Sequence, residues 1–591
     1  RFEQYDLNLV LPDPLLPRHQ RLTVEERIDA RGEVLVPLNR ADVVALAEQV
    51  REAGYESVAV GLLHSYLNDS HERMIGEVFA EMLPDVALSL SCEVSPQMRE
   101  YERFNIVVAN AYIKPLMKSY LGRLAGRLKE QGADCPIFLM HSGGGIISLE
   151  NAADFPVRLV ESGPAGGAVF AAHIAARHGL DKVLSFDMGG TTAKICLIKN
   201  QTPKTARVFE VARTYRFKKG SGMPISIPVI DMVEIGAGGG SLAHVDALQQ
   251  IRVGPESAGS EPGPACYGRG GERPAVTDAD LIQGKLDPDN FAGGSIKLDK
   301  TASAGALDAH LGGQLSIDTL EAAYGLTEVV DENMSNAARV HAVENGEDLS
   351  EYTMIAFGGA APLHAARLCE KLDIDRCLVP PGAGVGSAIG FLKAPFSFEA
   401  TRSVYVEFGA FDADAIRTTL GELKDEATTF VRTCDANAPI EAEYKVYMRY
   451  RGQGWEIPIS LTPEQAANPD METYKALFEA DYTQLFGRPV AGLEIVATVW
   501  AVNATTPTPP VERLAGLSGG AAASASGSRT VFDAAKGETV DTQVIERGDF
   551  APGTLAAGPS IVVEDETTII VPSSRQATVQ TDGCVDLVKK G

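Results

Sequence analysis

The stretch Val183–Ile198, which reads V-L-S-F-D-M-G-G-T-T-A-K-I-C-L-I, decides how the centre of this chain folds. An apolar run ends in Asp187, a glycine pair follows, and a second apolar run begins at Ala193. Glycine adopts backbone conformations that other residues avoid, so a glycine pair is typical of a tight turn between two buried strands. We therefore predict a strand-turn-strand hairpin with Asp187 at the end of its first strand.

This turn has the residue types that a phosphate site uses. Adjacent glycines expose backbone N–H groups to an anion without interference from Cβ atoms, and a carboxylate at the strand end can hold the accompanying Mg²⁺. The turn differs from a P-loop, which leads into a helix and carries Gly-Lys-Ser/Thr. A plain glycine turn between two core strands accounts for the same residues, so the hairpin alone leaves both interpretations open.

Two further glycine-bearing segments follow short runs that resemble strands. Glu351–Phe357 is a predicted strand, followed by the small residues Gly358–Pro362 and a predicted helix over Leu363–Leu372. Small residues at such a junction let a purine or a phosphate approach the backbone, where the helix N-terminus adds partial positive charge. A similar pattern predicts a strand before Gly163–Gly167 and a helix from Ala168, but there a close-packed turn is favoured over ligand contact.

The N-terminal part alternates helix-like and strand-like patterns, which predicts a parallel sheet covered by helices. The helix-like segments are Ala41–Ala53 and His71–Met82, and the strand-like segments are Ser57–Leu63 and Val86–Ser91. A longer helical pattern over Arg99–Gln131 contains Pro115, where we expect a break. The alternation indicates an α/β fold class for this part of the chain.

Composition and charge exclude several classes of protein. The chain has 591 residues and a formal net charge of -26, which opposes binding to nucleic acid or anionic lipid. A run of about 18 apolar residues, as a membrane span needs, does not occur in the sequence. The eight cysteines include no C-x-x-C pair, so we interpret them as reduced thiols of a cytoplasmic protein, without a zinc site or disulfides. His64, His244 and His364 lack metal-ligand spacing, and a transition metal is expected only in a partner.

Four motifs in a fixed order resemble the hydantoinase A/5-oxoprolinase family, which includes N-methylhydantoinase A-like proteins and is related to the ATP-binding subunits of acetone and acetophenone carboxylases. They are Asp187–Thr192, Gly236–Ser241, Val253–Gly268 and Phe357–His364. The similarity extends from about Leu15 to Val404 and more loosely to the end. The string V-G-P-E-S-A-G-S-E-P-G-P-A-C-Y-G, at residues 253–268, is the most specific part of it.

The resemblance implies an actin/hexokinase/heat-shock-ATPase-like fold, in which two related α/β subdomains hold ATP and Mg²⁺ between two glycine hairpins. Asp187–Thr192 matches the second hairpin, and Phe357–Pro362 resembles the adenosine-side motif. The first hairpin, an Asp-x-Gly-Gly-Thr motif, is absent from this sequence. We expect roughly one hundred residues to precede Arg1, a length suited to the βαβ units of a parallel sheet. We also expect the 591-residue chain to bind ATP poorly and an extended chain to bind it well.

The resemblance and the composition together predict five parts. Strands after Phe398 indicate a separate domain, and a segment rich in Pro, Gly, Ala and Ser is typical of a linker. The parts are the remainder of the family's N-terminal α/β domain at 1–98, a hydantoinase A-type nucleotide-binding domain at 99–398, an α+β C-terminal domain at 399–504, a linker at 505–528, and a small β-rich module at 529–591.

The resemblance also assigns roles to residues. Asp187, Thr191 and Thr192 are the predicted catalytic residues, and Asp187 is the predicted Mg²⁺ ligand. The predicted nucleotide-binding residues are Gly189, Gly190, Lys194, Gly358, Gly359, Ala360 and Pro362. Lys194 stands with Ala193 where the family often has Thr-Asp, so it either neutralises phosphate or faces solvent. The predicted catalytic base is left without a residue.

A second, weaker set is expected on the substrate side. Asp231, Glu234, Gly238 and Gly239 belong to a polar and glycine-rich stretch near the strand-like run Ile225–Ile230, where a glycine run serves no packing purpose by itself. His141 precedes the loop 142–145, although a lone histidine after a strand is more often structural. Members of the family often have a histidine before this glycine-rich loop, where this chain has Val233.

The family's common chemistry implies that ATP phosphorylates the oxygen of an amide or enol carbonyl. The leading hypothesis is an ATP-dependent hydrolase that opens a cyclic amide, namely a hydantoin, 5-oxoproline or a lactam. One alternative is the ATP-binding subunit of an acetone- or acetophenone-type carboxylase acting on a ketone. Another is a non-catalytic, actin-like nucleotide switch. The resemblance further implies a hetero-oligomer with a hydantoinase B-type second subunit.

Overall fold

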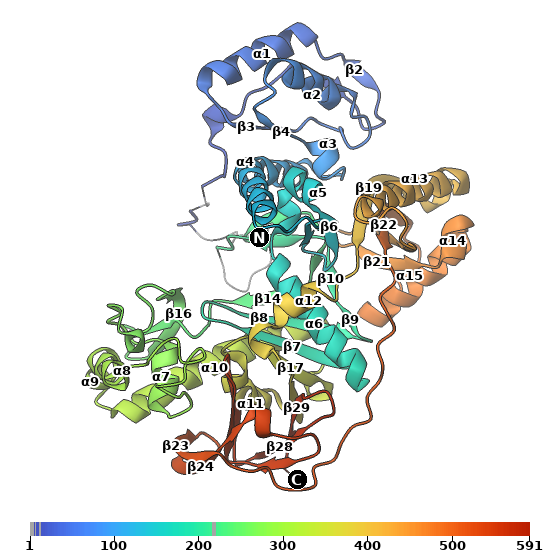
Figure 1. The fold of residues 1–591 in the computed structure, drawn as a ribbon. Coiled ribbons are helices and arrows are strands. Elements are labelled where there is room, and N and C mark those ends of the chain that lie inside the picture. The colour runs from blue at the N-terminus through green and yellow to red at the C-terminus, as the bar shows by residue number, and fades with distance from the viewer. Residues whose placement is uncertain (1–4, 6, 11–12, 215–219, 591) are drawn as a thin grey trace. The chain divides into compact units, whose positions relative to one another are not determined.

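The computed structural model describes residues 5, 7–10, 13–214 and 220–590 (Figure 1). The chain forms two compact units. The first contains residues 1–162, 205–229 and 394–508, and the second contains 163–204, 230–393 and 509–591. Each unit is therefore built from segments that are distant in the sequence. No helix among the described residues is long and apolar enough to cross a membrane.

The first unit begins with alternating helices and strands. They are α1 (Arg40–Ala53), β3 (Ser57–Val60), α2 (Ser70–Met82) and β4 (Ala87–Leu90). β3 and β4 pair in parallel, which confirms the predicted arrangement. Their apolar side chains form a small core, in which Val43, Ile75 and Val78 are almost fully buried.

The long helix α4 (Glu100–Glu130) passes through Pro115 as one element, so the predicted break is wrong. A proline removes one backbone hydrogen bond and crowds the preceding turn, at a cost of about 3 kcal/mol. Buried side chains on both sides of Pro115, from Ile106 to Leu121, hold the helix against the rest of the unit. Tertiary packing therefore outweighs the local preference.

The C-terminal part of the first unit is an antiparallel sheet. Its strand order is β19 (Ser397–Glu407), β22 (Ile495–Thr505), β20 (Glu441–Tyr450) and β21 (Ile457–Leu461). Helix α13 (Ala413–Arg432) packs on β19 and β22, and α15 (Met471–Phe486) packs on β21. Alternate residues of β20 are buried, as expected for a sheet with one covered face.

The second unit is organised around a nine-stranded sheet. Along its path lie β14 (Met232–Ile235), β8 (Ala193–Lys199), β7 (Lys182–Met188), β17 (Thr353–Phe357), β18 (Arg376–Val379), β29 (Val585–Lys589), β28 (Arg575–Val579) and β25 (Leu555–Ala557), while β9 (Thr202–Pro203) pairs with β8. β7 runs antiparallel to β8 and parallel to β17. The apolar residues of β7 and β17 are buried, which explains their nearly continuous hydrophobic sequences.

Two helices of the second unit are specified by clear local signals. α10 (Thr319–Glu344) begins with a capping box in which the side chains of Asp318 and Glu321 bind each other's backbone N–H groups. α11 (Ala361–Leu372) has Pro362 in its first turn and packs on β7, β17 and β18. These contacts anchor the end of β17 next to the centre of the sheet.

The glycine-bearing segment Gly163–Gly167 lies inside helix α6 (Ser162–His178), so the predicted turn is wrong. The predicted strand before it is also wrong, because residues Pro156–Leu159 form a 3-10 helix. A Cβ atom at Gly166 would lie 2.4 Å from the ring of Phe391, and one at Gly167 would lie 2.7 Å from the ring of Phe357. Glycine is therefore required for close packing of the helix, although it lowers helix propensity.

The C-terminal strands divide between two sheets. β23 (Gly527–Asp533), β24 (Glu538–Glu546), β26 (Ser560–Val563) and β27 (Thr568–Val571) form a four-stranded sheet, while β25, β28 and β29 extend the nine-stranded sheet. Residues 506–526 contain no helix or strand apart from one isolated bridge between Ala522 and Leu555.

Candidate functional site

The β7–β8 hairpin turns at Gly190 and Thr191, because the N–H of Gly189 donates to the carbonyl of Thr192 at 3.2 Å. Asp187 lies one residue before the end of β7 and pairs in register with Lys194 of β8. The predicted hairpin is therefore confirmed. Thr191 is exposed at the turn and Thr192 is partly buried.

The loop 236–240 supports this turn from one side. The N–H of Gly239 donates to the carbonyl of Gly189 at 3.0 Å, and the N–H of Gly240 donates to the carbonyl of Gly190 at 2.6 Å. In a trans peptide the C=O and the following N–H point in opposite directions. The N–H groups of Gly190 and Thr191 therefore point away from the loop, and within the described residues they donate no hydrogen bond.

The glycines of the turn and those of the supporting loop have different structural requirements. Neither Gly189 nor Gly190 has a positive φ, and a Cβ atom at either would meet no described atom within 4 Å. A Cβ atom at Gly238 would lie 2.7 Å from the backbone of Gly190 and Thr191. Packing therefore requires glycine at Gly238, which differs from our expectation for this run, whereas nothing in the described chain requires it at the turn.

The junction after β17 lies beside the hairpin. Phe357 is in register with Asp187, and the N–H of Ala360 donates to the carbonyl of Met188 at 3.0 Å. Gly358 has a φ of +93°, and a Cβ atom there would lie 2.4 Å from the Met188 carbonyl oxygen. The two glycine segments therefore meet at the carboxyl ends of neighbouring parallel strands, where open α/β sheets bind ligands.

The Asp187 carboxylate accepts a hydrogen bond from the Ser387 hydroxyl at 3.2 Å. Burial raises the pKa of Asp187, and the Ser387 hydrogen bond and the positive charge of Lys194 offset only part of that rise. A cation at this position would favour the ionised carboxylate. Ser387 was not among the residues predicted from the sequence, although the glycine-rich run 380–387 directly after the buried strand β18 repeats the pattern that identified Gly358.

Thr567 is a second residue that the sequence analysis missed. Its hydroxyl donates to the carbonyl of Gly359 at 2.9 Å, and so joins the connection between β26 and β27 to the β17–α11 junction. A Cβ atom at Gly384 would lie 2.6 Å from the Cβ atom of neighbouring Glu566. Thr567 and Gly359 are 208 positions apart, and Glu566 and Gly384 are 182 positions apart, so neither proximity leaves a local signal in the sequence.

Lys194 lies between two acidic side chains on one face of the sheet. It pairs in register with Asp187 on one side and with Glu234 on the other, and its Nζ is 3.5 Å from a carboxylate oxygen of Glu234. Asp231 is placed differently, with its carboxylate 3.9 Å from the Nζ of Lys204. Glu234 and Asp187 thus flank the same lysine, Lys194, whereas Asp231 lies next to Lys204.

His141 belongs to the first compact unit, whereas the hairpin belongs to the second. Its Nδ1 accepts from the N–H of Gly143 at 3.0 Å, so its Nε2 donates to the carbonyl of Ser397 at 3.1 Å. Burial and then the charge of Arg158 lower the pKa of His141 to about 4. The imidazole is therefore neutral, and its tautomer is determined by these two partners.

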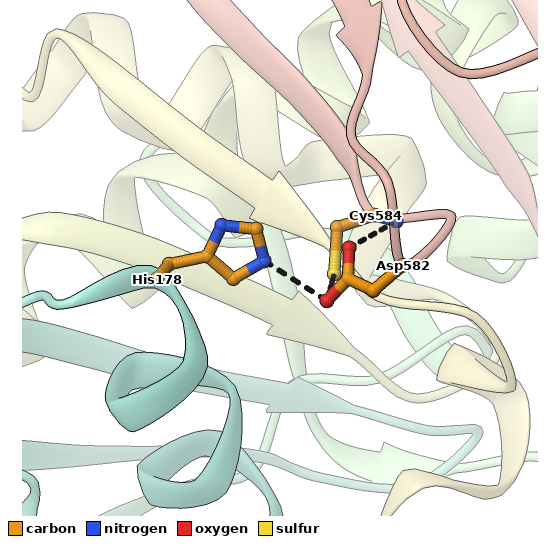
Figure 2. A group of neighbouring side chains, drawn as sticks. All are labelled: His178, Asp582 and Cys584. Carbon is orange, nitrogen blue, oxygen red and sulfur yellow. Dashed lines mark hydrogen bonds and ion pairs between the residues drawn. The ribbon is translucent and has the colours of Figure 1, made fainter. Parts of the chain in front are cut away.

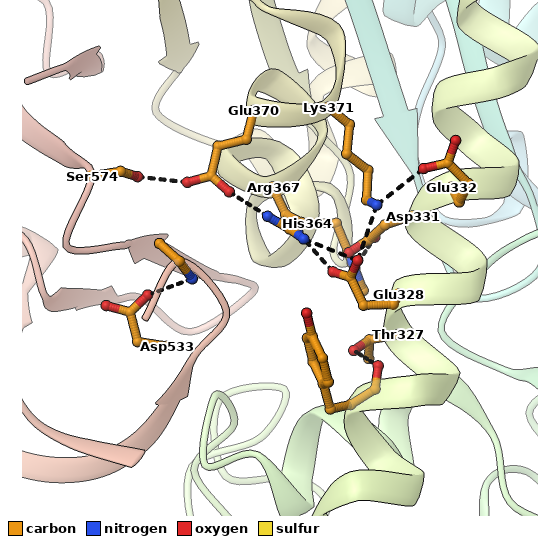
Figure 3. Close-up of polar contacts among 12 residues, drawn as sticks. Thr327, Glu328, Asp331, Glu332, His364, Arg367, Glu370, Lys371, Asp533 and Ser574 are labelled. Carbon is orange, nitrogen blue, oxygen red and sulfur yellow. Dashed lines mark hydrogen bonds and ion pairs between the residues drawn. The ribbon is translucent and has the colours of Figure 1, made fainter. Parts of the chain in front are cut away.

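A cavity of about 50 Å³ lies apart from the hairpin, against α10, α11 and the C-terminal sheet. Figure 3 shows that charged side chains near it pair with one another. Arg367 contacts both carboxylate oxygens of Glu328 at 2.7 and 2.9 Å, and also Glu370 at 2.8 Å. These pairs tie α10 to α11, so we interpret the charges as structural and assign the site to the hairpin.

Three family models match the chain. The Hydantoinase/oxoprolinase model matches residues 103–400, the N-terminal region model matches 1–83, and the C-terminal domain model matches 410–587. An uncharacterised protein of Methanocaldococcus jannaschii is 35% identical over 98% of this chain and 84% of its own length. Caprolactamase subunit alpha of Pseudomonas jessenii is 30% identical over 99% of this chain and 84% of its own length.

Two solved structures have the same mixed α/β fold. The ATP-dependent caprolactamase from Pseudomonas jessenii aligns with a TM-score of 0.84 and 29% identity, covering 100% of this chain and 85% of that chain. Nucleotide-free acetone carboxylase aligns with a TM-score of 0.77 and 25% identity, covering 98% of this chain and 82% of that chain. Both the sequence models and the fold therefore agree with the resemblance of the four motifs, and the chain belongs to the hydantoinase/oxoprolinase family.

Proposed function

We propose that this chain is the ATP-using subunit of an enzyme that opens a cyclic amide, such as a hydantoin, 5-oxoproline or a lactam. The observation that carries the proposal is the open turn at Gly189 and Gly190, where neither φ nor packing in the described chain requires glycine. Two backbone N–H groups adjoin it, and neither has a hydrogen-bond partner in the described part of the chain. Adjacent free N–H groups form a concavity that favours an anion such as a phosphate.

The residues around the turn fit Mg²⁺ and ATP. The half-buried Asp187 carboxylate at the strand end would hold Mg²⁺, and Lys194 would neutralise phosphate oxygens. Thr191 and Thr192 would supply hydroxyl groups beside the transferred phosphoryl group. Gly358, Gly359, Ala360 and Pro362 would accept the adenosine side, because the α11 N-terminus and small residues leave room for a flat ring.

Bound ATP would supply the phosphoryl group that converts an unreactive amide oxygen into a good leaving group. The chain's own contribution to such a transfer is positioning and neutralisation of charge. The Gly238 loop holds the turn rigidly, and Ser387 holds the Asp187 carboxylate. We therefore assign Gly238, Gly239 and Ser387 to positioning. A substrate-side role for His141, Asp231 and Glu234 remains a proposal.

The proposal includes an actin/hexokinase/heat-shock-ATPase-like arrangement, in which Asp187–Thr192 is one of two phosphate hairpins. We also propose that the five predicted parts are the chain's domains: the N-terminal remainder at 1–98, the nucleotide-binding domain at 99–398, the α+β domain at 399–504, the linker at 505–528 and the β-rich module at 529–591. A hydantoinase B-type subunit is the proposed partner. The caprolactamase and acetone carboxylase relatives support two chemistries, namely opening of a cyclic amide and carboxylation of a ketone. Ketone carboxylation is therefore the second candidate function.

Replacement of Asp187 tests the phosphoryl-transfer role. Asp187→Asn, assayed in the complete protein with its co-expressed partner, should lower substrate-dependent ATP turnover by at least about 100-fold, because it removes the proposed Mg²⁺ ligand. Asp181→Asn, near the opposite end of β7, is the matched control and should retain turnover. Near-normal turnover in Asp187→Asn would contradict the assignment.

The substrate dependence of ATP use separates the candidate functions. Cyclic amides should stimulate ADP formation without bicarbonate if the enzyme is a hydrolase. Stimulation only by a ketone together with bicarbonate would instead establish the carboxylase alternative. ATP binding without stimulation by either class would favour a nucleotide switch.

A further inference from the structure

We propose that His178, Asp582 and Cys584 form a zinc site that joins helix α6 to the connection between β28 and β29. Figure 2 shows the three side chains meeting around the Asp582 carboxylate. One ligand atom from each lies within 4.8 Å of the others. This inference is independent of the proposed ATP site, and it differs from our expectation from the sequence that the cysteines bind no zinc.

The three side chains are of the kinds that zinc selects. Imidazole nitrogen, thiolate sulfur and carboxylate oxygen are its usual protein ligands, and three of them with one open position form a common arrangement. The side chains of His178 and Asp582 are 3% and 1% exposed, and Cys584 is fully buried. Enclosure of this degree is unusual for a carboxylate unless a cation or several hydrogen bonds compensate it.

Two of the three separations are close to the edges of a zinc tetrahedron. The Nε2 of His178 lies 3.1 Å from the Oδ2 of Asp582, and the Sγ of Cys584 lies 3.4 Å from the same oxygen. Bonds of about 2.0 Å to nitrogen and oxygen and about 2.3 Å to sulfur place N and O about 3.3 Å apart and S and O about 3.5 Å apart in a tetrahedron. The third edge, between the His178 and Cys584 ligand atoms, is at most 4.8 Å, and these two side chains would close toward each other to complete the tetrahedron.

The protons and charges balance. In the structure His178 Nε2 and Cys584 Sγ share the Oδ2 atom, so both would give up these hydrogen bonds. The thiol proton is released to solvent. The imidazole, which donates from Nε2 to Asp582 in the metal-free cluster, loses that proton to solvent and takes one up on Nδ1, so Nε2 is free to bind the metal. One thiolate and one carboxylate then stand against Zn²⁺. The bond from the Cys584 N–H to Oδ1, at 3.1 Å, can remain and orient the carboxylate.

The alternative is a metal-free cluster held by the same hydrogen bonds, with Arg177 3.7 Å from Asp582 as a further cation. Burial raises the pKa of Cys584, and the negative charge of Asp582 raises it further. The thiolate is therefore disfavoured in the absence of a bound cation. The two cases differ in metal binding, and a bound metal would also stabilise the fold by linkage.

Metal titration of the full chain distinguishes these cases. The reduced, chelator-treated protein is titrated with Zn²⁺, and separately with Co²⁺, whose thiolate charge-transfer absorption reports a sulfur ligand. We expect one tight site per chain in the wild type and in Cys135→Ser, an exposed-cysteine control. Cys584→Ser should weaken Zn²⁺ binding by roughly 100-fold or more and abolish the cobalt band.

A thermal midpoint measured in chelator checks that Cys584→Ser still folds, since serine can retain a hydrogen bond to Asp582. Zinc should raise the midpoint of the wild type but not that of Cys584→Ser. Equal zinc binding by these two proteins, or cobalt bound to the wild type without a thiolate band, would overturn the proposal. His178→Gln provides a second variant, which should lose the same tight site.

Discussion

Gly190 and Gly238 are neighbours in space, yet glycine serves a different purpose at each. A Cβ atom at Gly190 would enter open space, and one at Gly238 would meet the backbone of the turn at 2.7 Å. We therefore expect Gly190→Ala to keep the thermal midpoint and to weaken ATP-analogue binding by about 10-fold or more. Calorimetry and isothermal titration of the complete protein with its partner measure the two effects.

Gly238→Ala is the matched variant for this test. It should lower the free energy of unfolding by about 1–3 kcal/mol, because backbone atoms must move to admit the methyl group. Unchanged ATP binding by a folded Gly190→Ala protein would instead support a plain glycine turn without a ligand role.

The buried His364 makes stability depend on pH. Its Nδ1 is 2.8 Å from Asp331 and its Nε2 is 3.2 Å from Asp280. Burial by itself lowers the pKa of His364, but the two carboxylates outweigh it and raise that pKa to about 9. The protonated His364 contributes to the free energy of unfolding, and this contribution is fully present below about pH 6.5. It is lost as the pH rises through 9.

We therefore expect the thermal midpoint to fall between pH 7 and pH 9.5, with up to about 3 kcal/mol of stability lost from this group. His364→Gln should be less stable at pH 7 and show a smaller fall, whereas exposed His244→Gln should behave as the wild type. Calorimetry across this pH range makes the measurement. A wild-type midpoint that stays level would show that His364 does not titrate there.

At the scale of an element, helix α6 tests why glycines stand inside a helix. A Cβ atom at Gly166 would lie 2.4 Å from Phe391, whereas one at Gly163 would meet nothing within 4 Å. Gly166→Ala should therefore destabilise the protein by about 1–3 kcal/mol. Gly163→Ala, in the first turn of the same helix, should be neutral or stabilise it by up to about 1 kcal/mol.

Denaturant unfolding of both variants measures these differences. The comparison removes the effect of helix propensity, which favours alanine at both positions, and leaves the packing contact as the difference. Equal stability of the two variants would show that α6 does not pack closely at Gly166.

At the scale of the whole molecule, we expect the chain to act with a second subunit. The relative caprolactamase subunit alpha is named as one part of a larger enzyme. The chain alone should therefore show less than about one tenth of the substrate-dependent ATP turnover of the co-expressed pair, because its site would lack the partner's groups. Size-exclusion chromatography and turnover assays of both preparations test this. Full activity of the chain alone would refute the expected division of labour.

The sequence by itself determined the local features and the family. Apolar runs on either side of Gly189 and Gly190 were enough to predict the hairpin, and four ordered motifs were enough to recognise the family. These predictions succeed because strand periodicity and turn chemistry act between residues close in sequence. The same local rules failed at Pro115 and at Gly163–Gly167, where packing against distant residues outweighs helix propensity.

Only the tertiary structure decided which distant residues meet. Parallel pairing of β7 and β17 brings Gly358 to Met188, and Ser387 reaches Asp187 across 200 positions of the sequence. His178 meets Asp582 and Cys584, which lie more than 400 positions further along the chain. Such contacts leave no periodic signal, because they depend on how whole elements pack to bury apolar surface rather than on neighbouring residues.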